Sequence, residues 1–272
     1  MLDLGVLHGD VLLFGGPYSN LQATEAVLTE AAKRGIPAQR MICTGDVTAY
    51  CGQPRETVAT IREAGILTVA GNCETQLAAG AMDCGCGFEE GTTCDLLSVG
   101  WFAHVDRQVG AQDRQWMATL PTMVVFRHAG RTVAVVHGGA TDIARFLWDV
   151  SPESEFVEEI AAITARVGPV DMVVAGHCGI PFVRQVAGVT WVNAGVIGMP
   201  PHDGSQGTRF AILSEAGVEF HVLCYDALKA YAEMQKAGLI QGYDQALLSG
   251  YWPSEDVLPP SLRLASLSRA SG

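Results

Sequence analysis

The stretch FGGPYSNLQATEAVL, from Phe14 to Leu28, joins the end of a predicted strand to the start of a predicted helix. The apolar run Val11–Phe14 has the length and composition of a buried strand, and it stops at two glycines. Shortly afterwards Asn20 offers an N-cap, and an amphipathic pattern continues to Lys33. A glycine-rich turn of this kind often carries the functional groups of an α/β enzyme, yet this one has no acid, histidine, lysine or cysteine.

The same alternation of strand and helix continues along the first third of the chain. Short apolar runs at Arg40–Thr44 and Ile66–Ala70 predict two further buried strands, and Arg55–Ala64 predicts a helix between them. Alternating strands and helices indicate a parallel sheet, whose functional loops follow the carboxyl ends of the strands.

The rest of the chain is less regular. Gly80–Asp95 is rich in glycine, cysteine and acids and predicts an inserted loop, followed by a helical piece near Gln112–Thr119. A hairpin around His128-Ala129-Gly130 and a helix over Glu153–Arg166 come next. Five more strands are predicted at Asp171–Ala175, Phe182–Val186, Thr190–Asn193, Arg209–Leu213 and Val218–Leu223. A helix near Asp226–Lys236 follows, and the last twenty residues are expected to be loosely structured.

Composition narrows the functional classes. The chain has 272 residues and a formal net charge of −12, so its field repels nucleic acid, and we expect no nucleic-acid partner. No apolar run approaches the ~20 residues of a membrane span, and no basic residue precedes the first apolar run, so we expect a cytoplasmic protein without a membrane partner. In a reducing compartment the eight cysteines are expected to be thiols or metal ligands.

Polar side chains follow several of the predicted strands directly. Asp46 follows the second strand and Asn72 the third, while His137 and His177 follow two later strands. A carboxylate, a carboxamide and two imidazoles are ligands suited to Mn, Fe, Zn or Ni. Each of these residues alone is typical of an ordinary loop, but together they predict a metal site that leaves positions open for water or phosphate oxygens.

The order of these motifs resembles the calcineurin-like metallophosphoesterase superfamily, especially its small bacterial phosphodiesterases. The family pattern is Asp-x-His, Gly-Asp, Gly-Asn-His-Glu, a lone His, and Gly-His-x-His, and the similarity covers roughly residues 11–225. The resemblance implies a four-layer α/β/β/α sandwich of two mixed sheets flanked by helices, with a two-metal site at the ends of the sheets. Residues 226–272 are then a C-terminal helical extension and tail.

Three departures from this pattern concern one half of the implied site. Gly16 and Tyr18 stand where the family has Asp-x-His, and Gly179 stands at the second histidine of Gly-His-x-His. In the family these three positions serve one metal. The resemblance assigns the other metal to the counterparts of four residues that are all present: Asp46, Asn72, His137 and His177. It therefore implies one retained transition-metal ion, divalent or trivalent.

Cys73 replaces the histidine of Gly-Asn-His-Glu, which in the family is thought to protonate the leaving group. A thiol is a poorer proton donor than an imidazolium, so Cys73 is a weak catalytic acid, a lost catalytic group, or a thiolate ligand. Tyr18 is predicted either to contact the substrate phosphate or to fill the space of the lost ligands. His202, after a turn that the family places near the site, is a further candidate for substrate contact.

The insert raises a separate question. Cys84 and Cys86 could direct two thiolates at one ion, and Cys94 or Cys73 could add a third, although this spacing is weak for a structural zinc site. The alternative is that these cysteines are free thiols. The sequence thus supports two hypotheses: a single-metal phosphoesterase acting on a small phosphorylated molecule, or a non-catalytic metal- or phosphate-binding sensor on the same scaffold. It leaves the oligomeric state open, a homo-oligomer included.

Overall fold

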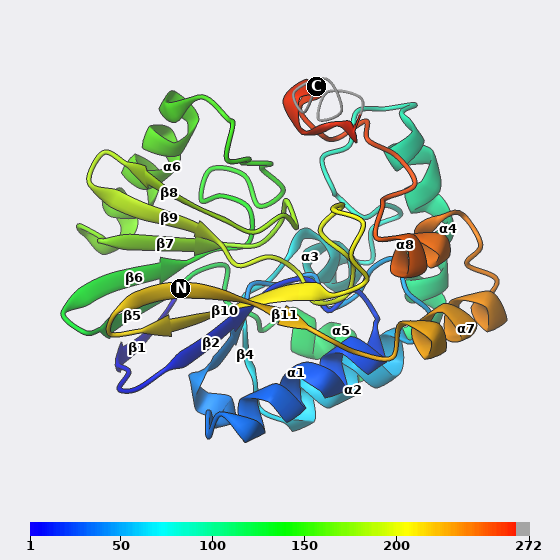
Figure 1. Cartoon of the computed structure of the whole chain (residues 1–272), viewed down its shortest axis with the longest axis horizontal. Helices are drawn as coiled ribbons and strands as arrows, with labels where there is room; N and C mark the ends of the chain where they lie inside the picture. Colours follow the sequence, from blue (N-terminus) through cyan, green and yellow to red (C-terminus); the bar gives the residue numbers. More distant parts are fainter. Residues whose placement is uncertain (265–272) are drawn as a thin grey trace.

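Two β-sheets packed face to face form the centre of the protein, with helices on their outer faces (Figure 1). The computed structural model describes residues 1–264. The first sheet has the strand order β1-β5-β6-β7-β9-β8 and contains both parallel and antiparallel pairs. Its strands are, in that order, Leu2–Val6, Val124–His128, Arg131–Val135, Met172–Ala175, Val189–Asn193 and Phe182–Val186.

The second sheet has the order β11-β10-β2-β3-β4, in which β2, β3 and β4 run parallel and β10 lies antiparallel to β2. Its strands are, in that order, Gly217–Leu223, Thr208–Ser214, Val11–Phe14, Met41–Cys43 and Leu67–Thr68. The predicted mixed α/β sandwich of two sheets flanked by helices is therefore confirmed.

Burial on both faces explains the continuous apolar run of β2. Val11 and Leu13 pack in the core between the sheets, together with Phe126 of β5. Leu12 and Phe14, on the opposite face of the strand, pack against the helices instead. A strand covered on both sides needs apolar residues at every position rather than at alternate ones.

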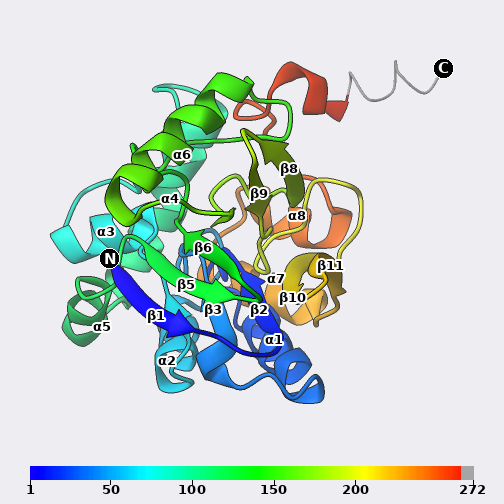
Figure 2. The same ribbon diagram turned by 90° about the vertical axis from the view of Figure 1, so that its left-hand side faces the viewer.

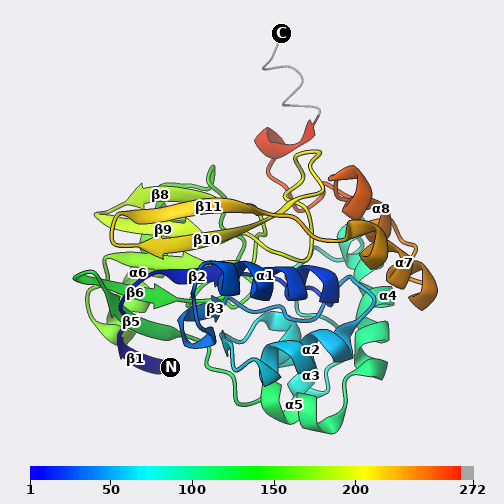
Figure 3. The ribbon, with the colours of Figure 1, turned by 60° about the horizontal axis from the view of Figure 1, so that its bottom comes forward.

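The helices cover the two outer faces separately (Figures 2 and 3). Two of them pack on the second sheet, α1 (Leu21–Lys33) and α2 (Pro54–Glu63), and α7 (Ala227–Ala237) packs against α1 and α8 (Tyr243–Ser249). The first sheet is covered by α6 (Glu153–Val167). The remaining helices are α3 (Asn72–Ala79), α4 (Thr93–Gln108) and α5 (Ala111–Met117), with short 3-10 turns at Ala38–Arg40 and Pro260–Leu262.

Four helices and strands lie outside the sequence predictions. They are β1, α3, α8 and α4, the last of which begins inside the segment predicted as a loop and extends well beyond it. In α4, Trp101 and Phe102 are buried while Leu96 and Val99 are exposed, so the helix shows no single apolar face in its sequence.

The described part of the last twenty residues, 253–264, has a single short 3-10 turn, which agrees with the expected loose structure. Leu258 is nevertheless buried and packs with the core beneath α6, so the segment is attached at this point. Residues 265–272 lie outside the described part of the chain. No helix among residues 1–264 is long and apolar enough to cross a membrane.

Candidate metal centre

Asp46 is held in an unusual backbone conformation by a buried glutamate. It follows β3 with a φ of 53°, in the left-handed region that few non-glycine residues adopt. The Glu74 carboxylate accepts hydrogen bonds from the backbone N–H groups of Asp46 at 2.8 Å and Gly71 at 3.0 Å. A Cβ at Gly71 would lie 2.3 Å from Asp46 Oδ1, so only glycine allows this close approach. Glu74 thus joins the two loops that carry Asp46 and Asn72.

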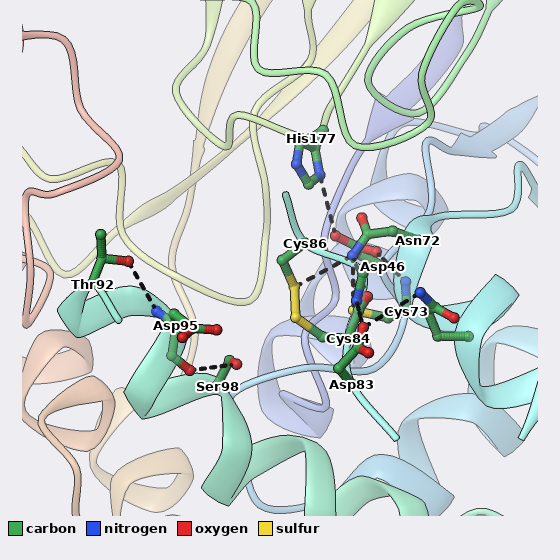
Figure 4. The surroundings of a disulfide bond; sticks show 12 residues. Asp46, Asn72, Cys73, Asp83, Cys84, Cys86, Thr92, Asp95, Ser98 and His177 are labelled. Atoms are coloured by element: carbon green, nitrogen blue, oxygen red, sulfur yellow. Dashed lines mark hydrogen bonds and ion pairs between the residues drawn. A yellow bond between two sulfur atoms is a disulfide. The ribbon is translucent and has the colours of Figure 1, made fainter. Parts of the chain in front are cut away.

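Asn72 is the first residue of α3, and its amide orientation is set by the insert. Its Nδ2 donates to the carbonyl oxygen of Cys84 at 2.9 Å and lies 3.4 Å from Cys86 Sγ (Figure 4). With the donors used in this direction, Asn72 Oδ1 faces the Nε2 atom of His137 at 3.0 Å.

The two histidines come from neighbouring parallel strands. His137 follows β6 and His177 follows β7, so their loops leave the same edge of the sheet. His137 Nδ1 donates to the carbonyl oxygen of Thr44 at 2.7 Å, which leaves Nε2 as the free acceptor of the neutral ring. That Nε2 lies 2.9 Å from His177 Nδ1 and 3.2 Å from Asp46 Oδ2.

The four polar atoms that converge here fit a metal ion. The oxygens of Asp46 and Asn72 can only accept hydrogen bonds. Among these four atoms, therefore, only the two imidazole nitrogens can carry a proton. His177 takes part through Nδ1; its other ring nitrogen, Nε2, is buried and has no hydrogen-bond partner within the described residues. Separations of 2.9 to 3.8 Å between these atoms match the ~3.0–3.4 Å between ligands that bind one ion at ~2.1 Å. In residues 1–264, Asp46, His137 and His177 form the one group of at least three His, Cys, Asp or Glu ligand atoms within 4.8 Å.

The pKa values reflect the same need for a positive charge. Burial opposes ionisation of Asp46, but His137 and His177 hold the pKa of this carboxyl well below its usual range. Burial alone would lower the pKa of His137, but Asp46 raises it above its ordinary value. Burial lowers the pKa of His177, and His137 adds to that effect. A proton on His137 thus partly compensates the negative charge of the Asp46 carboxylate, which a bound metal ion would compensate fully.

A family model described as the calcineurin-like phosphoesterase superfamily domain matches residues 7–216. The chain belongs to the calcineurin-like phosphoesterase superfamily. An uncharacterised protein of Methanocaldococcus jannaschii is 23% identical over 252 residues, which cover 86% of this chain and 95% of that protein. Family membership and the cluster together support phosphoesterase chemistry in general.

Solved structures agree on the fold. A crystal structure named as a metallophosphoesterase from Sphaerobacter thermophilus superposes with a TM-score of 0.67 at 22% identity, covering 90% of this chain and all of that one. A hypothetical protein from Pyrococcus horikoshii superposes with a TM-score of 0.70 at 15% identity, covering 91% and 99%.

The Tyr18 ring is buried and packs against Gly16. Tyr18 is 6% exposed, and a Cβ at Gly16 would lie 2.5 Å from its ring carbon Cζ. Burial, with the nearby charge of Asp46, raises the pKa of the Tyr18 phenol, so it stays neutral. Tyr18 also lines the cavity beside the cluster, so a substrate contact stays a prediction.

Cys73 is buried beneath Asp46 rather than exposed to the site. It is 1% exposed, packs in the core with α1 and α2, and its backbone N–H donates to Asp46 Oδ1 at 3.3 Å. Burial and the charges of Asp46 and Glu74 raise its pKa well above the usual thiol value. Within the described residues its Sγ is not among the clustered ligand atoms, which argues against the thiolate-ligand interpretation, and a catalytic role for Cys73 stays untested.

The cysteines of the insert do not form the metal site considered from the sequence. Cys84 and Cys86 are joined by a disulfide, contrary to the expectation of reduced cysteines (Figure 4). Cys94 is a buried free thiol, and the three sulfurs form no ligand cluster within the described residues. The Cys84–Cys86 loop instead contacts the metal centre through Asn72.

His202 has a structural role in this fold. Its Nε2 donates to Glu255 Oε1 at 2.9 Å, and its Nδ1 accepts the backbone N–H of Trp252 at 2.8 Å. Both ring nitrogens are therefore occupied by contacts within the protein, and a substrate contact by His202 stays a prediction. Sequence reasoning assigned no role to Trp252, which His202 positions, although the aromatic residues near the C-terminus were visible in the sequence.

Proposed function

We propose that this protein hydrolyses phosphate esters with a single metal ion held by Asp46, Asn72, His137 and His177. The observation that carries this proposal is the convergence of buried ligand atoms: Asp46 Oδ2, Asn72 Oδ1 and His177 Nδ1 all lie close to His137 Nε2. When bound, a transition metal would polarise the phosphoryl group and lower the pKa of the attacking water.

The protein's own residues have distinct tasks. Asp46 and His177 line a cavity, so a phosphoryl group there would lie beside the cluster. Thr44 fixes the tautomer of His137 through its carbonyl oxygen, and the insert fixes the amide of Asn72. No described side chain replaces the second metal of the superfamily, so the charge on the transition state is stabilised from one side.

This deficit predicts a substrate preference. Without a second metal or a catalytic imidazole at Cys73, the enzyme depends on leaving groups that need little protonation. Activated aryl phosphodiesters, such as bis(4-nitrophenyl) phosphate, should be hydrolysed faster than alkyl or nucleoside esters.

The first test combines metal analysis with hydrolysis. Protein purified without chelator should contain about one transition-metal ion per chain, and the Asp46→Ala/His177→Ala double variant should contain none. The His137→Ala variant should lose hydrolysis of bis(4-nitrophenyl) phosphate. His128→Asn is the matched control, because His128 is also buried but bonds the carbonyl oxygen of Gly9 away from the site. Metal-free protein even after reconstitution with Mn, Fe or Zn would contradict the proposal.

The non-catalytic alternative rests on one observation. The Tyr18 ring occupies the space beside Gly16 where the superfamily has a ligand, which suits a scaffold that binds without turnover. Tight binding of phosphate esters by the metal-loaded protein, with no hydrolysis above the His137→Ala background, would favour this alternative.

A further inference from the structure

Aromatic side chains form a large part of the wall of the cavity beside the metal cluster. The cavity has a volume of about 50 Å³, with Asp46 and His177 among its lining residues. The aromatic residues of its wall include Tyr50, Phe88, Phe146, Trp148 and Trp252.

A second hollow continues the cavity outward. It has a volume of about 210 Å³ and shares Phe88, Phe146, Cys94 and Val257 with the inner cavity. The two spaces therefore adjoin, and the path from the metal centre passes between the insert and the C-terminal segment. The alcohol part of an ester whose phosphoryl group lies beside Asp46 would extend into the outer hollow.

The aromatic rings along this path are already arranged as a stack. The Phe146 ring centroid lies 4.3 Å from that of His177. It lies 5.6 Å from that of Trp148, and the Phe146 and Trp148 rings are 2° from parallel. Phe88 stacks on Phe146 from the insert side at 6.2 Å. Flat apolar faces of this kind favour contact with another planar ring.

Charge along the path excludes a second anionic group. Neither lysine nor arginine is among the residues that line the two spaces, whereas Glu89 and Asp256 line the outer hollow. The chain as a whole carries a net charge of −12. A further phosphate or carboxylate on the substrate would find no cation and would be repelled by these carboxylates.

We propose that the substrate carries one phosphoryl group on an aromatic alcohol that has no further negative charge, an inference that rests on the proposed phosphoesterase function. Polyphosphates, nucleoside di- and triphosphates and sugar bisphosphates are thereby disfavoured. Phe88 and Phe146 select for the aromatic ring. Glu89 and Asp256 select against further anionic groups.

The test measures binding without turnover. Phenylphosphonate, methylphosphonate and 4-carboxyphenylphosphonate are titrated calorimetrically into Mn²⁺-loaded protein. Phenylphosphonate should bind about tenfold more tightly than methylphosphonate, because only it places a ring against the stack. The carboxylated compound should bind about tenfold more weakly than phenylphosphonate. Affinities within threefold of one another for all three, or no binding of any, would overturn the proposal.

Two variants locate the selectivity. Phe88→Ala should reduce the preference for phenylphosphonate over methylphosphonate to below threefold, while Tyr231→Ala, on α7 and outside the lining, should leave it unchanged. Glu89→Lys should strengthen binding of 4-carboxyphenylphosphonate without changing that of phenylphosphonate, since Glu89 is exposed. An unchanged preference in Phe88→Ala would also overturn the proposal.

Hydrolysis of the matching esters separates this inference from the function on which it rests. If the phosphonates rank as expected but no ester is hydrolysed, the site selects aromatic ligands and the phosphoesterase function is wrong. If esters are hydrolysed but the phosphonates bind equally, only the substrate inference is wrong.

Discussion

Glu74 shows how one residue outside the ligand set organises the metal centre. It is completely buried and accepts backbone hydrogen bonds from Asp46, Gly71 and Thr48. Burial and the neighbouring charge of Asp46 raise its pKa to about 7. The superfamily pattern contains this glutamate, but the sequence alone does not say that it joins the loops of two ligands.

Replacing Glu74 by glutamine should therefore weaken the metal site more than the fold. A glutamine has a single acceptor oxygen, so at least one of the three backbone N–H groups loses its partner. We expect Glu74→Gln to lower the free energy of unfolding by about 1–3 kcal/mol. The affinity for Mn²⁺ should fall about 10- to 100-fold, measured by calorimetry.

Asp244→Asn is the matched control for this prediction. Asp244 is also a buried carboxylate that accepts a backbone hydrogen bond, from Gly242, but it lies on α8, outside the metal cluster. It should show a similar stability loss with unchanged metal affinity. Equal losses of metal affinity in the two variants would contradict a positioning role for Glu74.

At the scale of elements, the strands could be predicted from the sequence better than the segments between them. The apolar run of β2 is buried on both faces, so its pattern alone identifies it. The Asn20 cap of α1 was predicted and is formed, with its side chain accepting from Ala23 N–H. In contrast, α4 was not predicted, because exposed Leu96 and Val99 hide its buried face.

Only part of the candidate site could likewise be predicted from the sequence. The sequence predicted that Asp46, Asn72, His137 and His177 lie together, because each follows a strand and parallel strands end at a common edge of the sheet. The Cys84–Cys86 pairing and the aromatic cavity depend on how the insert and the C-terminal segment fold over that edge. Such contacts between segments distant in sequence leave no local pattern.

The disulfide in the insert gives a prediction at this scale. Of the eight cysteines, Cys84 and Cys86 are paired, five are buried thiols and Cys224 is exposed. In protein purified without reductant, Ellman's reagent should react rapidly with one thiol in the native state. After denaturation it should detect six thiols, and after reduction eight.

The Cys84→Ser/Cys86→Ser double variant provides the control for the thiol count. It should give six thiols in the denatured protein both before and after reduction. Eight thiols in the unreduced, denatured wild type would show that the insert is not disulfide-bonded in solution. A second fast-reacting thiol in the native protein would contradict the burial of the other five.

At the scale of the whole molecule, the active-site edge of the sandwich is closed by two segments far apart in the chain. The insert contributes Phe88, and the C-terminal segment contributes Trp252 and Val257 to the same cavity. His202 holds the C-terminal segment in place, because its two ring nitrogens form hydrogen bonds with Trp252 and Glu255. The C-terminal extension therefore contributes to the cavity beside the candidate metal centre.

Removing this connection should open the cavity while sparing the metal centre. In His202→Ala, the backbone N–H of Trp252 and the carboxylate of Glu255 both lose a partner, and we expect the free energy of unfolding to fall by about 1–3 kcal/mol. Limited proteolysis should cut residues 250–264 faster than in the wild type, with metal content unchanged. The KM for an aryl ester should rise more than kcat falls, because the aromatic wall is disturbed and the ligands are not.

His202→Gln keeps one hydrogen-bonding group and should be less affected. A loss of metal from His202→Ala, with no change in proteolysis, would instead place His202 in the metal centre.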